Sequence, residues 1–103
     1  MSLTLKQISE NKRLIENELM GVRRRGIDNI VDFLNDNGFF TQAASTKWHQ
    51  AYKGGLAEHS LEVLENMIDL NEGLNLGFNR DSMVIVSILH DVCKIDSYIE
   101  NKN

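Results

Sequence analysis

The chain of 103 residues contains no proline, only one cysteine and no long apolar run. Because proline interrupts helices, its absence favours a helical chain. The single cysteine, Cys93, excludes an intramolecular disulfide and fits a reducing compartment. The longest apolar run, residues 83–89, is interrupted by Ser87 and is far shorter than the ~20 residues of a membrane span. The N-terminal residues have no apolar stretch typical of a secretory signal, so we expect a cytoplasmic protein with no membrane partner.

Positive charge is also scarce, since 11 Lys and Arg residues face 15 Asp and Glu residues, a net charge of −4. Residues 1–53 carry a surplus of positive charge and residues 54–103 a surplus of negative charge. A chain this acidic is not typical of proteins that bind nucleic acid by electrostatic attraction. The one basic cluster, residues 23–25, is interpreted as a solvated helix end that complements the helix dipole. The alternative interpretation is contact with a phosphate.

Apolar residues recur at helical spacing over about residues 3–22 and again over residues 27–37, where Gly38 is a typical helix stop. A third helix is predicted from Ala57 to about residues 71–73. Residues 39–56 follow neither a helical nor a strand period, so we expect an irregular loop that contributes aromatic anchors to the core. These anchors are Phe39, Phe40, Trp48 and Tyr52.

The apolar run over residues 83–89 has no polar face, and periodicity alone cannot distinguish a buried strand from a buried helix. Asn79 as a potential N-cap and the helical surroundings favour a helix from Arg80. No repeat or linker is visible, so residues 1–103 are expected to form one all-α domain. We expect two apolar surfaces to pack against each other, formed by Leu61, Leu64, Ile68, Val84, Ile88 and Leu89.

Three potential metal ligands, His59, His90 and Asp91, lie on the third and fourth predicted helices. His59 precedes the end of its helix by about 12 residues, and His90 follows the start of the next helix by about 10. At ~1.5 Å per residue, these offsets place both histidines at the same level of an antiparallel pair. Imidazole and carboxylate together suit divalent transition metals. The alternative is that these residues are ordinary surface or capping residues.

These positions lie in two motifs, GGLAEHS at residues 54–60 and ILHDVCK at residues 88–94. Together they resemble the HD superfamily of metal-dependent phosphohydrolases, whose ligand pattern is a His, a His-Asp doublet and a later Asp. The segment FFTQAASTKWHQAYKGGLAEHSLEV resembles a subgroup found in phage and bacterial genomes, so that the resemblance covers about residues 25–100. It implies an HD-domain-like helical bundle in which His59, His90 and Asp91 bind the metal.

The resemblance also implies a role for each site residue. Asp91 would bind the metal and help deprotonate the attacking water, and Lys94 would take part in catalysis and hold a substrate phosphate. His49, in the predicted loop, is a candidate to contact the substrate or a second metal ion, and packing against Trp48 and Tyr52 is an equally good interpretation. The cofactor would be a divalent metal, with Mn, Fe, Ni, Zn, Co and Mg all compatible. The substrate would be a nucleotide or another phosphoester, and a nucleic-acid substrate is compatible because some relatives are joined to exonuclease or helicase-relaxase proteins.

The sequence departs from the family pattern in two places. Cys93 stands where the commonest form of the doublet motif has glycine. The final Asp of the pattern normally follows the doublet by tens of residues, and Asp96 is too close to match it. We therefore expect an N-terminal part of an HD domain or a degenerate copy. The alternative function is a non-catalytic helical interaction module.

Overall fold

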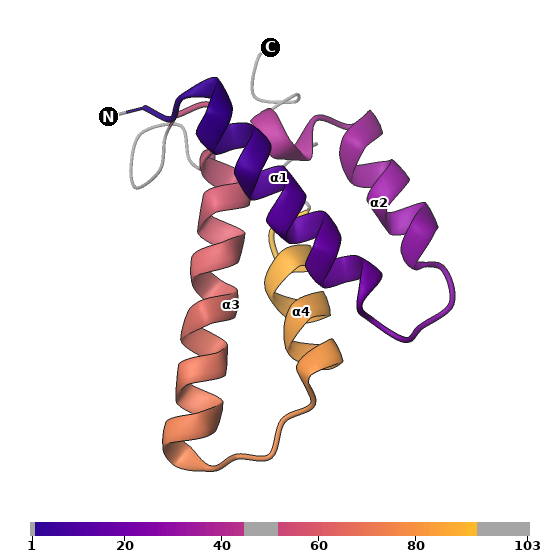
Figure 1. Cartoon of the computed structure of the whole chain (residues 1–103), viewed down its shortest axis with the longest axis vertical. Coiled ribbons are helices and arrows are strands. Elements are labelled where there is room, and N and C mark those ends of the chain that lie inside the picture. Colours follow the sequence, from indigo (N-terminus) through magenta and orange to yellow (C-terminus); the bar gives the residue numbers. More distant parts are fainter. Residues whose placement is uncertain (1, 45–51, 93–103) are drawn as a thin grey trace.

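The computed structural model describes residues 2–44 and 52–92, and within these ranges it contains helices and no strand. The prediction of an all-α helical bundle is confirmed (Figure 1). No described helix is both long and apolar enough to cross a membrane. In chain order the elements are α1 (Leu5–Met20), α2 (Ile27–Asp36), the 3₁₀ helix η1 (Phe39–Thr41), α3 (Gly55–Leu74) and α4 (Arg80–Leu89).

Helices α3 and α4 form an antiparallel hairpin, as the short connection predicts (Figure 1). Side-chain amides fix both ends of the connection. Asn71 accepts a hydrogen bond from the Phe78 backbone N–H at 2.8 Å. Asn79 caps α4 by accepting from the Ser82 N–H at 3.3 Å, which confirms the predicted N-cap. The connection therefore sets the register of α4 along α3.

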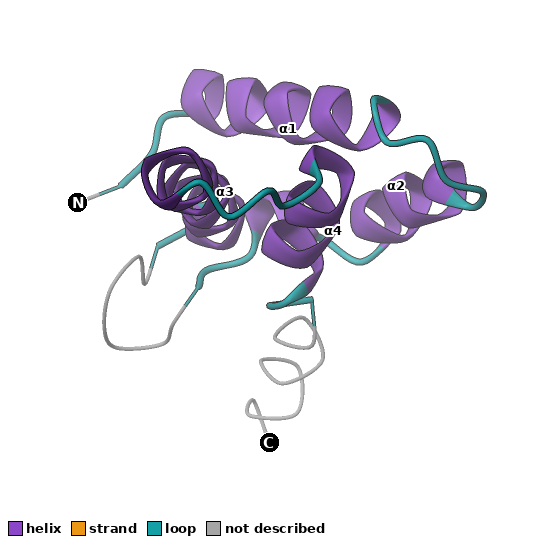
Figure 2. Cartoon of the chain, turned by 90° about the horizontal axis from the view of Figure 1, so that it is seen from below, coloured by secondary structure: helices purple, strands orange, loops and turns teal. Residues whose placement is uncertain are grey.

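The core lies where α3 and α4 face each other beneath α1 (Figure 2). Leu64, Val84 and Ile88 are at most 4% exposed, so the predicted contact between the two apolar surfaces is confirmed. Leu61, Ile68 and Leu89 are only partly buried and line the edge of this core. Helix α1 adds Ile15 and Leu19, both fully buried. The apolar run of α4 thus forms a helix and not a strand, with one side buried and Val86 exposed.

The described parts of the predicted loop, residues 39–44 and 52–56, are more regular than the sequence indicates. Residues 39–41 form a 3₁₀ turn, and α3 begins at Gly55, two residues before the predicted start. Phe39 and Phe40 are buried as expected, whereas Tyr52 is only half-buried. Trp48 lies outside the described residues. The pattern missed the start of α3 because tertiary contacts of the backbone stabilise it in place of a capping side chain.

The prediction that the basic cluster at residues 23–25 lies at a helix end is wrong, because α1 ends at Met20. The cluster lies in the connection between α1 and α2 and binds the start of α4. The Arg23 backbone N–H donates to Asp81 Oδ2 at 3.2 Å, and Arg24 Nη2 donates to Ser82 Oγ at 3.0 Å. These two contacts fix the α1–α2 connection against α4.

We expect the Leu64→Ala variant to lower the free energy of unfolding by about 2–5 kcal/mol, because it leaves a cavity between α3 and α4. Leu70→Ala on the same helix is the matched control, since Leu70 is 58% exposed. The control should change stability by less than about 0.5 kcal/mol. Urea denaturation measures both values. Equal losses for the two variants would contradict the core described above.

We expect Gly54→Ala to destabilise the protein by about 1–3 kcal/mol through backbone strain alone, since Gly54 has a φ of +86°. A Cβ at this position would also lie 2.7 Å from Ile8 Cγ1, so the Ile8 side chain or α1 itself would have to move. Gly73→Ala is the control, because the space around Gly73 is open and its φ is ordinary. The control should be neutral or stabilising by up to about 1 kcal/mol. A Gly54→Ala variant as stable as wild type would contradict the close approach of α1 to this turn.

Candidate metal centre

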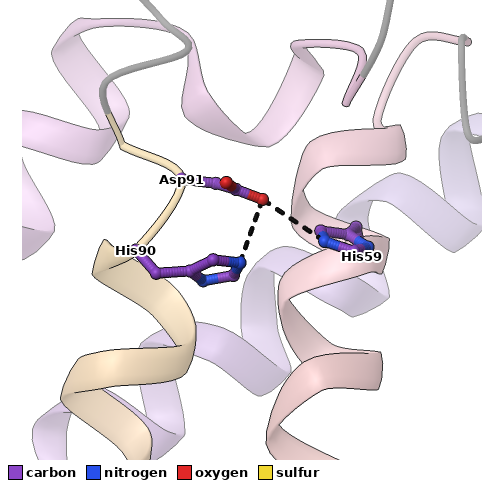
Figure 3. A group of neighbouring side chains, drawn as sticks. All are labelled: His59, His90 and Asp91. Carbon is purple, nitrogen blue, oxygen red and sulfur yellow. Dashed lines mark ion pairs between the residues drawn. The ribbon is translucent and has the colours of Figure 1, made fainter.

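Two imidazoles and one carboxylate converge at the upper end of the α3–α4 hairpin (Figure 3). The Nε2 atom of His59 lies 3.3 Å from Asp91 Oδ2. The Nε2 atom of His90 lies 3.1 Å from the same oxygen. The ring centroids of the two histidines are 5.7 Å apart. The prediction that these three residues meet at one point is confirmed, and they lie close enough together to hold a metal ion.

His59 reaches this point because of its place on α3. It lies in the second turn of the helix, on the side that faces the end of α4 (Figure 3). Ser60, the next residue, and Leu56, three residues earlier, are both fully buried. His59 therefore lies at the margin of the core, and its side chain is 30% exposed. The offset along the antiparallel helices then brings it level with His90, as the sequence predicts.

The His-Asp doublet does not lie inside a helix, contrary to the expectation from sequence. Helix α4 ends at Leu89, His90 is its C-cap, and Asp91 lies in the turn that follows. His90 Nδ1 contacts the Ser87 carbonyl oxygen at 2.7 Å. That carbonyl is the acceptor that the Asp91 N–H would use if the helix continued. The imidazole thus competes with the backbone for this acceptor, and Asp91 leaves the helix and turns toward His59.

The contact with Ser87 also fixes the tautomer of His90. Because a carbonyl oxygen can only accept, Nδ1 carries the proton, and in a neutral ring Nε2 presents a lone pair. This lone pair faces Asp91 Oδ2, which in a carboxylate is an acceptor too. Two acceptors 3.1 Å apart repel each other unless a proton or a metal ion binds both. A backbone carbonyl that orients an imidazole through its second nitrogen is typical of metal sites.

The two distances from Asp91 Oδ2 to the imidazole Nε2 atoms are those expected around one shared ion. Ligand atoms ~2.1 Å from an ion and about 90–110° apart around it lie ~3.0–3.4 Å from each other. The contacts of 3.1 and 3.3 Å fall in this range. A mixed set of imidazole and carboxylate suits Mn, Fe, Co, Ni or Zn better than the all-oxygen sites that Mg prefers. The donor set therefore fits a divalent transition metal.

Burial is uneven around the centre. The Asp91 side chain is 12% exposed and its Oδ2 atom is buried, whereas the imidazoles of His59 and His90 are 30% and 34% exposed. A carboxylate buried to this degree is unfavourable unless positive charge or hydrogen-bond donors compensate it. The exposed side of the imidazoles leaves the centre accessible to solvent. The arrangement thus combines a buried anion with an open side, as catalytic metal sites require.

Several residues proposed from the sequence lie outside the described residues: His49, Cys93, Lys94 and Asp96. Among the described residues, one cluster of potential metal-ligating side chains is found, formed by His59, His90 and Asp91. Asp91 is the only Asp in this cluster. Two further contacts next to the centre have no signal in the sequence. The Tyr52 hydroxyl donates a hydrogen bond to Glu58 Oε1, next to His59. The Ser87 carbonyl orients His90. No residue spacing indicates either contact, because both depend on where helices begin and end.

The comparison with curated proteins gives one informative similarity. The chain is 38% identical over 64 residues to a dihydroneopterin 2′,3′-cyclic phosphate phosphodiesterase from Methanocaldococcus jannaschii. The aligned region covers 58% of this chain and 26% of the relative, so the chain spans about a quarter of that protein's length. No family model and no solved structure matches the chain. The similarity, at this coverage, supports a relationship to the phosphohydrolases.

Proposed function

We propose that this protein is an HD-type, metal-dependent phosphohydrolase and that His59, His90 and Asp91 are its metal ligands. The observation that carries the proposal is the convergence of two Nε2 atoms on one buried carboxylate oxygen, with His90 already oriented by Ser87. The partial similarity to a cyclic phosphate phosphodiesterase supports phosphoester chemistry. When bound, a divalent ion would polarise a phosphoryl oxygen and lower the pKa of a water molecule.

The residues of the chain have separate tasks in this proposal. Asp91 supplies negative charge from the buried side and accepts a proton from the attacking water. His59 and His90 bind the metal ion through their Nε2 atoms, on the solvent-exposed side of the centre, where a phosphoester can approach. Three protein ligands leave coordination positions for water and for a substrate oxygen. Following the family resemblance, Lys94 holds the substrate phosphate, and His49 is a further candidate for contact with the substrate.

The proposed substrate class is small phosphoesters, nucleotides included. The relative's name specifies a 2′,3′-cyclic phosphate, so cyclic phosphodiesters are the first group to assay. A nucleic-acid substrate is compatible with the family resemblance but has no support among the described residues. The subgroup common in phage and bacteria, and a cytoplasmic location, are likewise parts of this proposal that rest on sequence.

We expect the chain to bind Mn²⁺ or Ni²⁺ with a stoichiometry of one, measured by isothermal titration calorimetry. Asp91→Asn should weaken binding by about 100-fold or more, because the buried anion is lost. Asp69→Asn is the matched control, since it removes the same charge from an exposed position of α3. The control should bind as tightly as wild type. Equal losses of affinity in both variants would show that the ion is attracted by the general acidity of the α3–α4 hairpin.

We expect hydrolysis of bis(p-nitrophenyl) phosphate and of 2′,3′-cyclic nucleotides to stop after treatment with EDTA and to return with Mn²⁺. His59→Ala should lower kcat/KM by about 100-fold or more, since loss of a ligand removes the charge that stabilises the transition state. Metal binding without any turnover on either substrate would instead favour the non-catalytic interaction module. Turnover that is unaffected by EDTA would contradict metal dependence.

A further inference from the structure

The segment that starts α3 has no capping side chain, although it carries His59. Gly54 occupies the N-cap position with a left-handed backbone, and no side chain accepts from the first turn. Two backbone contacts hold this start against the end of η1. The Gly54 N–H donates to the Thr41 carbonyl at 3.1 Å, and the Leu56 N–H donates to the Gln42 carbonyl at 2.9 Å. The first turn of α3 thus depends on contacts outside the helix.

One side-chain contact spans this start. The Tyr52 hydroxyl, three residues before α3, donates to Glu58 Oε1 in the first turn of the helix. The pair is part-buried, and a hydrogen bond to a charged acceptor is worth more than one between neutral groups. It closes a ring around Gly54 and Gly55, the two residues of the chain with the most conformational freedom at this point. The bond therefore restrains the turn from which α3 extends.

Glu58 is followed directly by His59, whose Nε2 must lie close to Asp91 on another element. The first turn of a helix has unsatisfied N–H groups and is the part most prone to fraying. Fraying at Glu58 would displace His59, and shifts of about 1 Å are enough to impair a metal site. Glu58 does not belong to the cluster of metal-ligating groups found among the described residues.

We propose that Tyr52 and Glu58 are a positioning pair that holds His59 in the geometry required for metal binding. This inference rests on the proposed metal-dependent function. In this proposal Tyr52 has a task beyond packing. The Glu58 carboxylate acts as a hydrogen-bond acceptor and does not bind the metal. Removing either partner should have the same consequence, because each acts through the other.

The test uses Co²⁺, which reports both affinity and coordination geometry through its visible absorption spectrum. Tyr52→Phe and Glu58→Ala should each weaken Co²⁺ binding by about tenfold, which corresponds to ~1.4 kcal/mol. Both should also change the shape of the spectrum. The double variant should be no weaker than either single variant. Glu58→Gln retains an oxygen acceptor for the Tyr52 hydroxyl, so its affinity should stay within about threefold of wild type.

A stability control separates positioning from general destabilisation. Ile15→Val removes one methylene from the core in α1, a helix that contributes no residue to the centre, and should cost about 0.5–1.5 kcal/mol of stability. Its Co²⁺ affinity and spectrum should equal those of wild type. Far-UV circular dichroism confirms that each variant is folded at the temperature of the titration.

Three results would overturn the inference. Wild-type affinity and spectrum in Tyr52→Phe would exclude the positioning role while leaving the proposed function intact. A loss in Glu58→Gln as large as in Glu58→Ala, with Tyr52→Phe unaffected, would show that the Glu58 charge acts on its own. No Co²⁺ binding by the wild-type chain would overturn the proposed metal centre together with the positioning pair.

Discussion

The antiparallel packing of α3 against α4 is the constraint on which the candidate centre depends. His59 and Asp91 are 32 positions apart in the chain, and their side chains meet only because the hairpin returns α4 alongside α3. Burial of Leu64, Val84 and Ile88 stabilises this pairing, and the amides of Asn71 and Asn79 set its register. A shift of one helical turn, ~5.4 Å, would separate the imidazole from the carboxylate. The register of α4 along α3 therefore determines the geometry of the site as well as the packing of the core.

The end of α4 makes the second contribution to the geometry of the candidate centre. A continuous helix would direct His90 and Asp91 about 100° apart around its axis. The contact of His90 Nδ1 with the Ser87 carbonyl accompanies the end of the helix, so the two neighbouring side chains reach the same point by different routes. The same contact leaves Nε2 of His90 as the nitrogen that faces Asp91. The end of α4 and the orientation of the His90 imidazole are thus linked through the same hydrogen bond.

Much of this arrangement could be predicted from local sequence signals. The spacing of apolar residues predicted the helices, and Asn79 predicted the start of α4. The distances of His59 and His90 from the connection predicted that the two residues lie at the same height along the antiparallel helices. These signals lie within single helices or depend on helix length alone. They sufficed because a short connection leaves an antiparallel hairpin as the favoured arrangement.

Other features could not be predicted because tertiary contacts determine them. The start of α3 is fixed by the carbonyls of Thr41 and Gln42, about 14 residues earlier, and no capping residue marks it. The partner of Tyr52 depends on the turn at Gly54, whose conformation is linked to the close approach of Ile8. Arg23 and Arg24 contact α4 across the fold, although their sequence is typical of a helix end.

The charge distribution of the hairpin bears directly on the proposed chemistry. Between residues 54 and 92 the sequence has seven Asp and Glu residues and a single Arg. That residue, Arg80, lies at the opposite end of α4 from the centre and pairs with Glu18. A phosphoester approaching His59 and His90 thus meets a hairpin of strongly negative net charge, which opposes binding of an anion. A divalent cation held by Asp91 and the two imidazoles would reverse the local sign of the charge. The charge of the described hairpin is therefore consistent with the metal-bound centre that we propose for phosphoester chemistry.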